Sequence, residues 1–507
     1  MSVGSNIAQP GNPVVDADRR ATWSDCRRTD PVDAAEGTDI PLVVDLDGTL
    51  LRSDLLIETA FRRAGRDPGA IWGMIRALRR RKACLKRFLS DGADCSPETL
   101  PYDADILSII KRARLAGRKV YLASGSHDAF VGAIARHLDI FDGHFATSGT
   151  TNLTGVAKAD LLVRTFGRGR FDYIGNDRAD LPVWDAARQA IAIRAPRRVA
   201  AQLRRAKPEA QFVAHERTTV KDWVRQLRVH QYAKNALVFV PMLAAHAITP
   251  ANVAIALLVA VAFCMAASAC YILNDLIDLQ EDRLHRSKRD RPLARGDIPI
   301  QHAILAVPVL LIGAAIISIS VSWAFAAVLA AYFALTVAYS LYLKRILLID
   351  VLTLAGLYTI RVLGGAVALS IPLSSWLVVF SLSLFVSLAL MKRFVELAAL
   401  IDAGKPSPAN RDYEKIDLGM LAALSAAAGF NAVTVLALYV SSGSVGLLYS
   451  RPELLLLACP VMTFWIGRAL ILAQRREMQD DPVLFAIKDP QSRLSGLAML
   501  VVFLVAV

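Results

Sequence analysis

The stretch Cys270-Tyr-Ile-Leu-Asn-Asp-Leu-Ile-Asp-Leu-Gln-Glu-Asp-Arg283 continues an apolar segment, near 251–273, that is long enough to cross a lipid bilayer. On an α-helix Asp275, Asp278 and Asp282 lie at roughly 0°, −60° and −20° around the axis, so three carboxylates share one face. Without partners they repel one another at the membrane boundary. Divalent cations relieve that repulsion, and Mg²⁺ prefers carboxylate and phosphate oxygens. The stretch therefore predicts a membrane helix that ends in a metal site.

Polar and basic residues flank these aspartates. Asn274 precedes the first of them, and Lys288, Arg289 and Arg291 follow the last. A carboxylate face followed by a basic run suits a metal ion together with the phosphates of a substrate. The alternative is an acidic helix end that is only solvated at the interface. We favour the combined site, with metal ligands at Asn274, Asp275, Asp278 and Asp282.

Further apolar windows give nine predicted membrane spans. They lie near 230–249, 251–273, 301–320, 323–343, 349–370, 374–392, 416–441, 453–473 and 492–507. With a cytoplasmic N-terminus, the connections on the cytoplasmic side carry 16 lysine and arginine residues, whereas the opposite connections carry only Arg451. Basic residues collect in cytoplasmic connections, so this asymmetry supports the count and the orientation. We predict an all-α, multi-pass bundle in the inner or plasma membrane.

The sequence before this bundle has the composition of a soluble domain, with frequent charges up to about Asp222. Residues 1–38 contain no apolar core of a signal peptide, so we expect a disordered cytoplasmic tail. The net charge of +13 does not indicate a nucleic-acid partner, because membrane orientation explains the basic residues of the second half. We expect a tail over 1–38, an α/β domain over 39–195, a basic linker or interfacial helix over 196–225 and the transmembrane domain over 226–507.

The motif Asn274-Asp275-x-x-Asp278-x-x-x-Asp282 resembles the first aspartate motif of the UbiA prenyltransferase superfamily, over about residues 222–507. The resemblance implies a bundle of nine helices that binds a diphosphate through Mg²⁺. Most members carry a second motif, DxxxD, on a later helix. In its place this chain has Lys392-Arg393-Phe-Val-Glu396. The departure argues against the common isoprenoid diphosphate donor.

Further stretches resemble one branch of that superfamily, the mycobacterial decaprenyl-phosphate phosphoribosyltransferases. These stretches are Arg228-x-x-Gln231-x-x-Lys234-Asn235, Ser287-Lys-Arg-Asp-Arg-Pro-Leu293, Asp350, Ile360-Arg361 with Gly364-Gly365, and Ile371-Pro-Leu-Ser374. The resemblance implies 5-phosphoribosyl 1-diphosphate (PRPP) as donor and a polyprenyl phosphate as acceptor. The products are polyprenyl-phosphoryl 5-phosphoribose and diphosphate.

In that reaction Mg²⁺ on Asp275, Asp278 and Asp282 holds the leaving diphosphate, and an anionic lipid phosphate needs no strong general base. The other predicted substrate-binding residues of this half are Gln231, Lys234, Asn235, Lys288, Arg289, Arg291, Tyr339, Lys344, Asp350, Arg361, Lys392, Arg393 and Glu396. Glu396 lies one turn beyond Lys392 and could orient that lysine or bind a ribose hydroxyl. For each basic residue alone, membrane anchoring is the competing explanation. Arg361 falls within a span, so a polar partner is expected.

The soluble half contains a second motif. Residues 40–50, Ile-Pro-Leu-Val-Val-Asp-Leu-Asp-Gly-Thr-Leu, predict a buried strand that ends at Asp45 and Asp47. Three pieces follow in order: a strand ending at Ser124, then Lys158, then the strand Phe171-Asp-Tyr-Ile-Gly with acids to Asp180. This set resembles the haloacid dehalogenase (HAD) superfamily over about residues 39–195, which implies a Rossmann-like parallel sheet. We expect residues 51–118 to form a small helical cap.

The HAD resemblance implies a role for each matched residue. Asp45 is the nucleophile, Asp47 the general acid and base, and Thr49, Ser124, Lys158 and Asp180 contact the substrate phosphate. A second Mg²⁺ lies between Asp45, Asp47 and the last acidic loop. There the chain has Asn176-Asp177 where the family usually has an aspartate first, so either residue is a candidate ligand. Weaker metal binding or a non-catalytic, regulatory domain is the alternative.

Together the halves suggest one hypothesis: the membrane half makes polyprenyl-phosphoryl 5-phosphoribose, and the soluble half removes its 5-phosphate, for arabinose-containing glycans such as cell-wall arabinan. The main rival is transfer of an isoprenoid from its diphosphate to an aromatic acceptor. The absence of a second aspartate motif argues against this rival, because such enzymes normally use that motif to bind the isoprenoid diphosphate.

Overall fold

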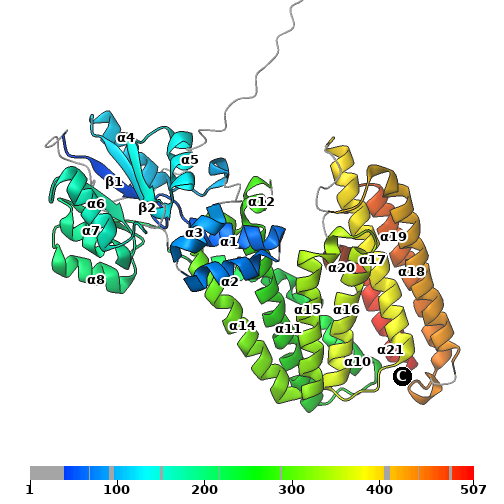
Figure 1. Ribbon diagram of the computed structural model, residues 1–507. Coiled ribbons are helices and arrows are strands. Elements are labelled where there is room, and N and C mark those ends of the chain that lie inside the picture. The colour runs from blue at the N-terminus through cyan, green and yellow to red at the C-terminus, as the bar shows by residue number, and fades with distance from the viewer. Residues whose placement is uncertain are drawn as a thin grey trace, which may run out of the picture.

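The computed structural model describes residues 39–507 apart from 68, 81, 91–95, 149–151, 216, 286–287, 405–410, 443–444 and 479–481, so the predicted tail over 1–38 lies outside the described residues. Figure 1 shows two parts: an α/β domain and a bundle of long helices, joined where α1 meets α12. This is the predicted fold class.

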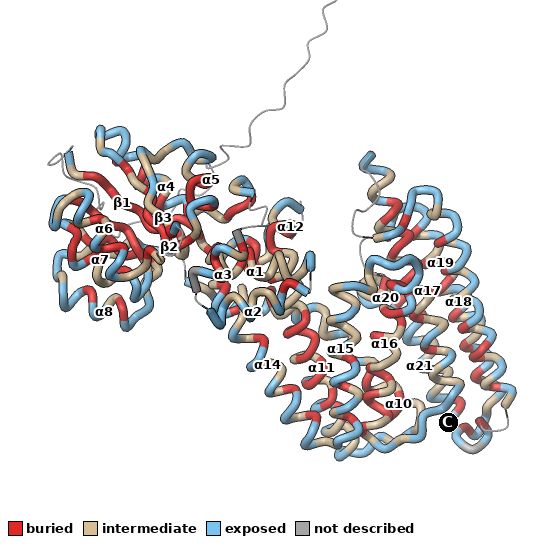
Figure 2. The backbone as a smooth tube through the Cα atoms, viewed as in Figure 1, coloured by how far each residue is buried: buried red, intermediate tan, exposed pale blue. Residues whose placement is uncertain are grey.

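A six-stranded parallel sheet forms the centre of the N-terminal domain, in the order β3-β2-β1-β4-β5-β6. Its strands are β1 Leu42–Asp45, β2 Val120–His127, β3 Gly143–Thr147, β4 Asp172–Gly175, β5 Ala190–Ile193 and β6 Gln211–Val213. Successive residues of β1 face opposite sides, so Leu42 and Val44 join one apolar cluster and Val43 the other. Both faces of the sheet are covered, as a parallel sheet requires, and Figure 2 shows its strands buried.

Helices cover each face of this sheet. On one side lie α4 Ala104–Leu115 and α5 Asp128–Leu138; on the other lie α6 Val156–Phe166, α7 Leu181–Ala186 and α8 Arg197–Ala206. Short 3₁₀ turns occupy η1 Pro97–Thr99 and η2 Arg178–Asp180. The structure changes the expected bounds of the linker and of the cap. The expected linker starts later than residue 196, because α8 packs on the sheet and β6 pairs with β5, so the sheet continues to Val213.

The expected cap is also smaller than residues 51–118. It consists of α1 Leu55–Arg66, α2 Ala70–Arg80 and α3 Lys82–Ser90. The later helix α4 belongs to the sheet instead, because Ile106, Ile109 and Ile110 are buried in its core. The cap is tied to the sheet domain through Lys86, whose Nζ donates to the Gly125 carbonyl and, at 2.7 Å, to Asn152 Oδ1.

Seven helices among the described residues are long and apolar enough to cross a membrane. Five of them are α11 Pro250–Ile277, α14 Ile300–Val321, α15 Trp323–Leu341, α16 Ile349–Ala368 and α17 Ser375–Asp402. The sixth, Lys415–Val440, joins η5 Lys415–Asp417 to α18 Leu418–Val440. The seventh, Pro452–Gln474, joins η7 Pro452–Leu457 to α19 Ala458–Gln474. They correspond to seven of the nine predicted spans. The chain is therefore a multi-pass membrane protein.

The other two predicted spans are not confirmed. The segment near 230–249 forms a 3₁₀ helix, η3 Val229–Phe239, and a five-residue helix, α10 Val240–Ala244. Its polar residues and Pro241 disfavour a regular α-helix, and His246, at φ 54°, follows its end. The last segment forms α21 Pro490–Ala506, which is apolar but has 17 residues where a span needs about 20.

Short elements connect the long helices. They are α9 Val220–Gln226, α12 Leu279–Leu284, α13 Pro292–Arg295, η4 Leu343–Arg345, η6 Val445–Leu447 and α20 Pro482–Lys488. The helix that carries the aspartates is not continuous as expected, because α11 ends at Ile277 and Asp278 lies between α11 and α12. This break changes where the three carboxylates point.

The cap docks on the aspartate end of the bundle. Arg283 of α12 makes a two-pronged ion pair with Glu58 of α1, at 2.6 and 2.9 Å, and both side chains are buried. Ile57 and Phe61 of α1 pack against the apolar cluster at the end of α11. The two halves therefore share a close interface beside Asp282.

Candidate active sites

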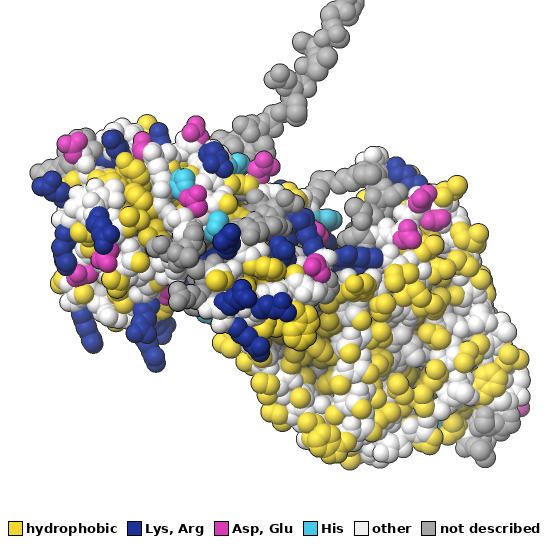
Figure 3. Space-filling view, in the orientation of Figure 1, with side chains coloured by type: hydrophobic (Ala, Val, Ile, Leu, Met, Phe, Trp, Pro, Cys, Tyr) yellow, Lys and Arg dark blue, Asp and Glu magenta, His cyan; other side chains and the backbone are white. Residues whose placement is uncertain are grey.

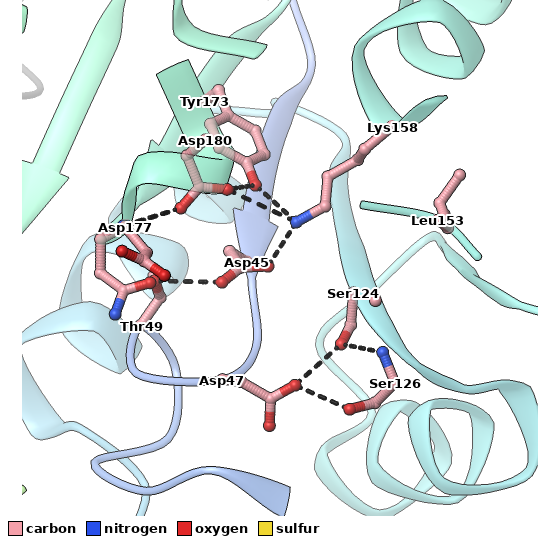
Figure 4. A network of polar contacts seen from close by, with 12 residues as sticks. Asp45, Asp47, Thr49, Ser124, Ser126, Leu153, Lys158, Tyr173, Asp177 and Asp180 are labelled. Carbon is pink, nitrogen blue, oxygen red and sulfur yellow. Dashed lines mark hydrogen bonds and ion pairs between the residues drawn. The ribbon is translucent and has the colours of Figure 1, made fainter. Parts of the chain in front are cut away.

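The first candidate site lies at the carboxyl end of the parallel sheet (Figure 4). Asp45 ends β1, and its Oδ1 accepts from Lys158 Nζ at 2.7 Å. The same lysine donates to the Tyr173 hydroxyl at 2.9 Å, and that hydroxyl donates to Asp180 at 2.7 Å. Lys158 and Asp180 also form an ion pair at 3.5 Å. Residues from β1, α6, β4 and η2 thus converge, although they are far apart in the sequence.

Burial perturbs the acidity of this site. Removal from water raises the pKa of Asp45 to about 7, and the nearby Lys158 only partly offsets this effect. The pKa of Lys158 is itself raised, because its attraction to Asp45 and Asp180 outweighs its own burial, which acts in the opposite direction. The Lys158 ammonium thus pairs with both the Asp45 and the Asp180 carboxylates. A second cation near Asp45 would be electrostatically favourable.

Asp47 lies in the loop after β1 and is held by three donors. Its Oδ2 accepts from Ser126 Oγ at 2.7 Å and from Ser124 Oγ at 3.3 Å, and its Oδ1 accepts from the Leu55 amide at 2.8 Å. Ser126 and Tyr173 are functional candidates that the sequence analysis missed. The signal for Ser126 was its position two residues after Ser124, on the same face of an extended segment.

In the last acidic loop, the two candidate metal ligands, Asn176 and Asp177, differ in their contacts. Thr49 Oγ1 lies 3.3 Å from Asn176 Oδ1 and 3.5 Å from Asp45 Oδ2, so the amide oxygen approaches the Asp45 carboxylate. Asp177 instead accepts from the Arg178 amide at 2.6 Å and caps the following turn. Hard oxygens of Asp45 and Asn176, near the chain at Asp47, fit Mg²⁺. No group of three His, Cys, Asp or Glu side chains suited to a metal occurs in the described part of the chain.

The second candidate site surrounds the end of α11. Asp275 Oδ1 accepts from Arg228 at 2.5 Å and from Arg291 at 2.9 Å, and its Oδ2 accepts from Gln226 Nε2 at 2.8 Å. Arg291 Nη1 also donates to Asp282 Oδ2 at 2.5 Å. Two buried carboxylates therefore converge on one guanidinium nitrogen. Gln226 was not predicted, because its pairing depends on how α9 packs against α11.

The remaining predicted residues of this site lie around that pair. Asp278 lies 3.9 Å from Lys344 of η4, and Lys288 lies 3.6 Å from Asp282. Burial lowers the pKa of Lys344 and, despite Arg291, raises the pKa of Asp282. Asn274 is half-buried and Arg289 is exposed. The break at Asp278 separates its carboxylate from the other two, so the predicted face of three carboxylates is replaced by a pair and a single group.

This donor set still fits a divalent cation. One oxygen of Asp275 and one oxygen of Asp282 both contact Nη1 of Arg291, whose side chain is 26% exposed. Carboxylate oxygens of this kind are hard ligands. A cation bound there would replace the arginine as their partner and leave Arg291 to contact a substrate phosphate.

A third polar cluster occupies the position of the missing second aspartate motif. Arg393 of α17 donates to Asp350 at 2.6 Å and to the Tyr339 hydroxyl at 2.8 Å, and it also pairs with Glu396. Asp350 accepts from Tyr413 at 2.6 Å, and Glu396 also pairs with Arg411. Tyr413 and Arg411 were not predicted. The cluster is internally paired, which indicates that Arg393 and Asp350 hold helices α16 and α17 together.

Four predicted residues line a cleft of about 300 Å³ between η3, α17 and α20. They are Gln231, Lys234, Lys392 and Glu396, and His230 and apolar residues of α20 complete the wall. Arg361 does not belong to this cleft. It is buried in α16 and donates to Asn235 Oδ1 at 2.7 Å and to the Tyr332 hydroxyl at 2.9 Å, which are the polar partners expected for a charge within a span.

Comparisons with known proteins relate this chain to one family and to several bacterial proteins. Residues 236–494 match the UbiA prenyltransferase family. The chain is 34% identical to the protein y4nM of Sinorhizobium fredii over 92% of this chain and 91% of that protein. It is 36% identical to the nodulation protein NoeC of Azorhizobium caulinodans, over 55% of this chain and 91% of NoeC. It is also 36% identical to the decaprenyl-phosphate phosphoribosyltransferase of Mycolicibacterium smegmatis, over 35% of this chain and 58% of that enzyme.

Two solved structures show a weak similarity to this chain. A UbiA homologue from Archaeoglobus fulgidus bound to GPP and Mg²⁺ is 15% identical, with a TM-score of 0.42, and covers 56% of this chain and 99% of its own. A HAD family hydrolase from Salmonella enterica is 16% identical, with a TM-score of 0.26, and covers 34% of this chain and 66% of its own.

The fold and the sites define a multi-pass membrane enzyme with a soluble N-terminal domain. Because the family match spans just over half of the sequence, the chain belongs to the UbiA prenyltransferase family. In the N-terminal domain, Asp45 ends β1, Ser124 lies in β2 and Asn176 follows β4, in the expected order, and Lys158 of α6 contacts Asp45. This domain is therefore HAD-like and is fused ahead of the UbiA domain.

Proposed function

We propose that the membrane domain transfers the 5-phosphoribosyl group of PRPP to a polyprenyl phosphate, such as decaprenyl phosphate, and that the HAD-like domain removes the 5-phosphate from the lipid product. One observation carries the choice of donor. Lys234 and Lys392 line the cleft beside α17, where a prenyl diphosphate would need a second set of metal-binding carboxylates. The similarity to decaprenyl-phosphate phosphoribosyltransferases supports the same choice.

The transfer needs positioning more than proton transfer. A phosphate oxygen of the lipid attacks C1 of PRPP, the new C1–O bond forms, and the bond from C1 to the diphosphate oxygen breaks with both electrons leaving on the diphosphate. Arg228 and Arg291 hold Asp275, and Lys234 and Lys392 line the cleft beside α17. Mg²⁺ held by Asp275 and Asp282 would supply charge neutralisation for the leaving diphosphate.

The second reaction uses the sheet site. Asp45 attacks the phosphorus of the 5-phosphate and forms an aspartyl-phosphate, while the ribose 5-oxygen leaves and takes a proton from Asp47. Asp47 then removes a proton from water, which attacks the same phosphorus and releases inorganic phosphate. Lys158 and Ser124 contact the two aspartates and are placed to bind phosphoryl oxygens. Mg²⁺ at Asp45 and Asn176 would offset the charge of the phosphate.

Both sites are proposed to face the cytoplasm. Lys288, Arg291 and Lys344 lie beside the aspartates at the end of α11, and Lys392 lines the cleft beside α17, as expected for cytoplasmic connections. Fusion to the bundle keeps the HAD-like domain at high effective concentration near the lipid product. Plasma membrane location with a cytoplasmic N-terminal domain follows from this proposal.

The full chain in nanodiscs, supplied with PRPP labelled in the ribose and with decaprenyl phosphate, tests both steps by mass spectrometry of the lipid. The wild type should yield polyprenyl-phosphoryl ribose, and Asp45→Asn should stop at the 5-phosphorylated lipid. Glu98→Asn, at an exposed position of the same domain, is the matched control and should behave as wild type.

Two outcomes would contradict the proposal. If only the 5-phosphorylated lipid forms and Asp45→Asn makes no difference, the HAD-like domain binds phosphate without turnover and has a regulatory role. If a prenyl diphosphate and an aromatic acid give product while PRPP gives none, the chain is an isoprenoid transferase of the usual kind.

A further inference from the structure

Helix α2 of the cap exposes an apolar face. Trp72 is 75% exposed, Leu78 52%, Ile71 42% and Ile75 39%. Their spacing places them on one side of an α-helix, whereas Ala70, Gly73, Met74 and Ala77 face the cap. Gly73 lies directly on the Phe88 ring of α3, so the inner face is already packed. The outer face has no partner among the described residues of the chain.

Basic residues lie within and beside this apolar face. Arg79 falls between Ile75 and Trp72 around the helix, Arg76 and Arg80 follow beyond Trp72, all three are exposed, and α2 contains no acidic residue. Figure 3 shows Lys and Arg side chains gathered over the cap, next to the apolar surface of the bundle. A helix with an apolar face that includes tryptophan, and with arginines along its edge, is the type that lies in the interface of a bilayer.

The position of α2 supports the same conclusion. The preceding helix α1 ends over the bundle, where Gly65 packs on Ile277, the last residue of α11, and its carbonyl lies 3.5 Å from Arg345 in the connection between α15 and α16. Ends of membrane helices mark the level of the lipid headgroups. Because α2 begins five residues after Gly65, it lies at that level, beside the membrane and not far above it.

We propose that α2 is an interfacial anchor that inserts Ile71, Trp72, Ile75 and Leu78 into the cytoplasmic leaflet and places its three arginines among anionic headgroups. The partner is the lipid bilayer itself. The inference does not depend on the substrate of either site. For the proposed phosphatase it has a consequence, since an anchored cap keeps the sheet site at the level where a lipid-linked phosphate would be presented.

Lipids with brominated acyl chains test the contact, because bromine quenches tryptophan only at close range. The full chain and Trp72→Phe are reconstituted in nanodiscs with brominated or ordinary lipid, and the difference between the two proteins isolates the Trp72 signal. We expect that signal to fall by about half, since an interfacial helix places its apolar face roughly 5–10 Å into the headgroup and acyl boundary. Trp72→Phe should fold normally, because the side chain is mostly exposed.

A second arm tests the arginines and the alternative occupants. Quenching of Trp72 should be stronger in phosphatidylglycerol than in phosphatidylcholine, and replacing Arg76, Arg79 and Arg80 by Gln should remove that difference. Unchanged Trp72 fluorescence in brominated lipid, with full access to a water-soluble quencher, would overturn the proposal. Protection from both quenchers would also overturn it, because a second copy of the chain would then cover this face.

Discussion

The two candidate sites bind their carboxylates in different ways. In the sheet site, Asp45 and Asp180 share one buried lysine, and every residue of the network comes from a strand or from an element that follows one closely. At the end of α11, Asp275 and Asp282 are paired with Arg228 and Arg291, long side chains from connecting segments. The difference suggests a rigid site for in-line attack at phosphorus and an adjustable site whose arginines exchange carboxylates for substrate phosphates.

The largest expected effect comes from removing the proposed nucleophile of the rigid site. Asp45→Asn should lower dephosphorylation of the supplied 5-phosphorylated lipid by roughly 10⁴-fold or more, as loss of a catalytic nucleophile does. Transfer from PRPP should remain unchanged, because the side-chain contacts of Asp45 in the described structure are with Thr49 and Lys158 of its own domain. Radiolabelled lipid products, separated by chromatography, measure both rates. Equal loss of both activities would show that the sites are not separate.

The complementary change is Asp275→Asn in the adjustable site. Transfer should fall by about 10²–10³-fold, because a buried charge that would bind the metal in the proposed mechanism, and that pairs with two arginines, is lost. Dephosphorylation of added 5-phosphorylated lipid should persist. Asp412→Asn, in the connection after α17, is a matched control with a carboxylate outside both sites. A transfer rate that survives Asp275→Asn would place the diphosphate elsewhere.

A smaller effect is expected at the interface between the two regions. Glu58→Gln leaves buried Arg283 without its charged partner, which costs about 1–3 kcal/mol. Amides of α1 and α12 should therefore exchange with deuterium about tenfold to a hundredfold faster, as measured by mass spectrometry. Exchange in β4, inside the sheet, should not change. Uniform acceleration throughout the domain would instead indicate loss of the fold.

The smallest effect concerns pH. Burial, with Asp47 nearby, raises the pKa of Asp54 to about 6. The folded state holds this proton more tightly than the unfolded chain, in which the Asp54 carboxyl titrates near pH 4. The protonated carboxyl therefore stabilises the fold fully below about pH 4, and this contribution is lost as the pH rises through about 6.

Asp54→Asn keeps an oxygen for the Ile57 amide but cannot ionise. The variant should unfold a few degrees higher than wild type at pH 8, and the gap should close near pH 4. Scanning fluorimetry of the full chain in detergent measures both values. A difference in unfolding temperature that does not depend on pH would assign the effect to the N-cap hydrogen bond of α1 and not to the charge of Asp54.

Much of this protein follows from local sequence. The lengths of apolar segments predicted seven of the observed membrane helices, because a bilayer of fixed thickness demands about 20 residues. The order of Asp45, Ser124, Lys158 and Asn176 predicted one site, because the carboxyl ends of neighbouring parallel strands meet at one edge. The aspartates at the end of α11 and just after it predicted a second charged site from three residues and their spacing.

Tertiary structure decided what those charges contact. Gln226 and Arg228 reach Asp275 only because the segment from α9 to η3 folds against α11, and helical periodicity did not predict the break at Asp278. Strand β6 lies in a basic, weakly apolar segment and is identified only by its pairing with β5. Contacts between residues far apart in the chain depend on the whole fold, whereas helix length and residue spacing depend on neighbours alone.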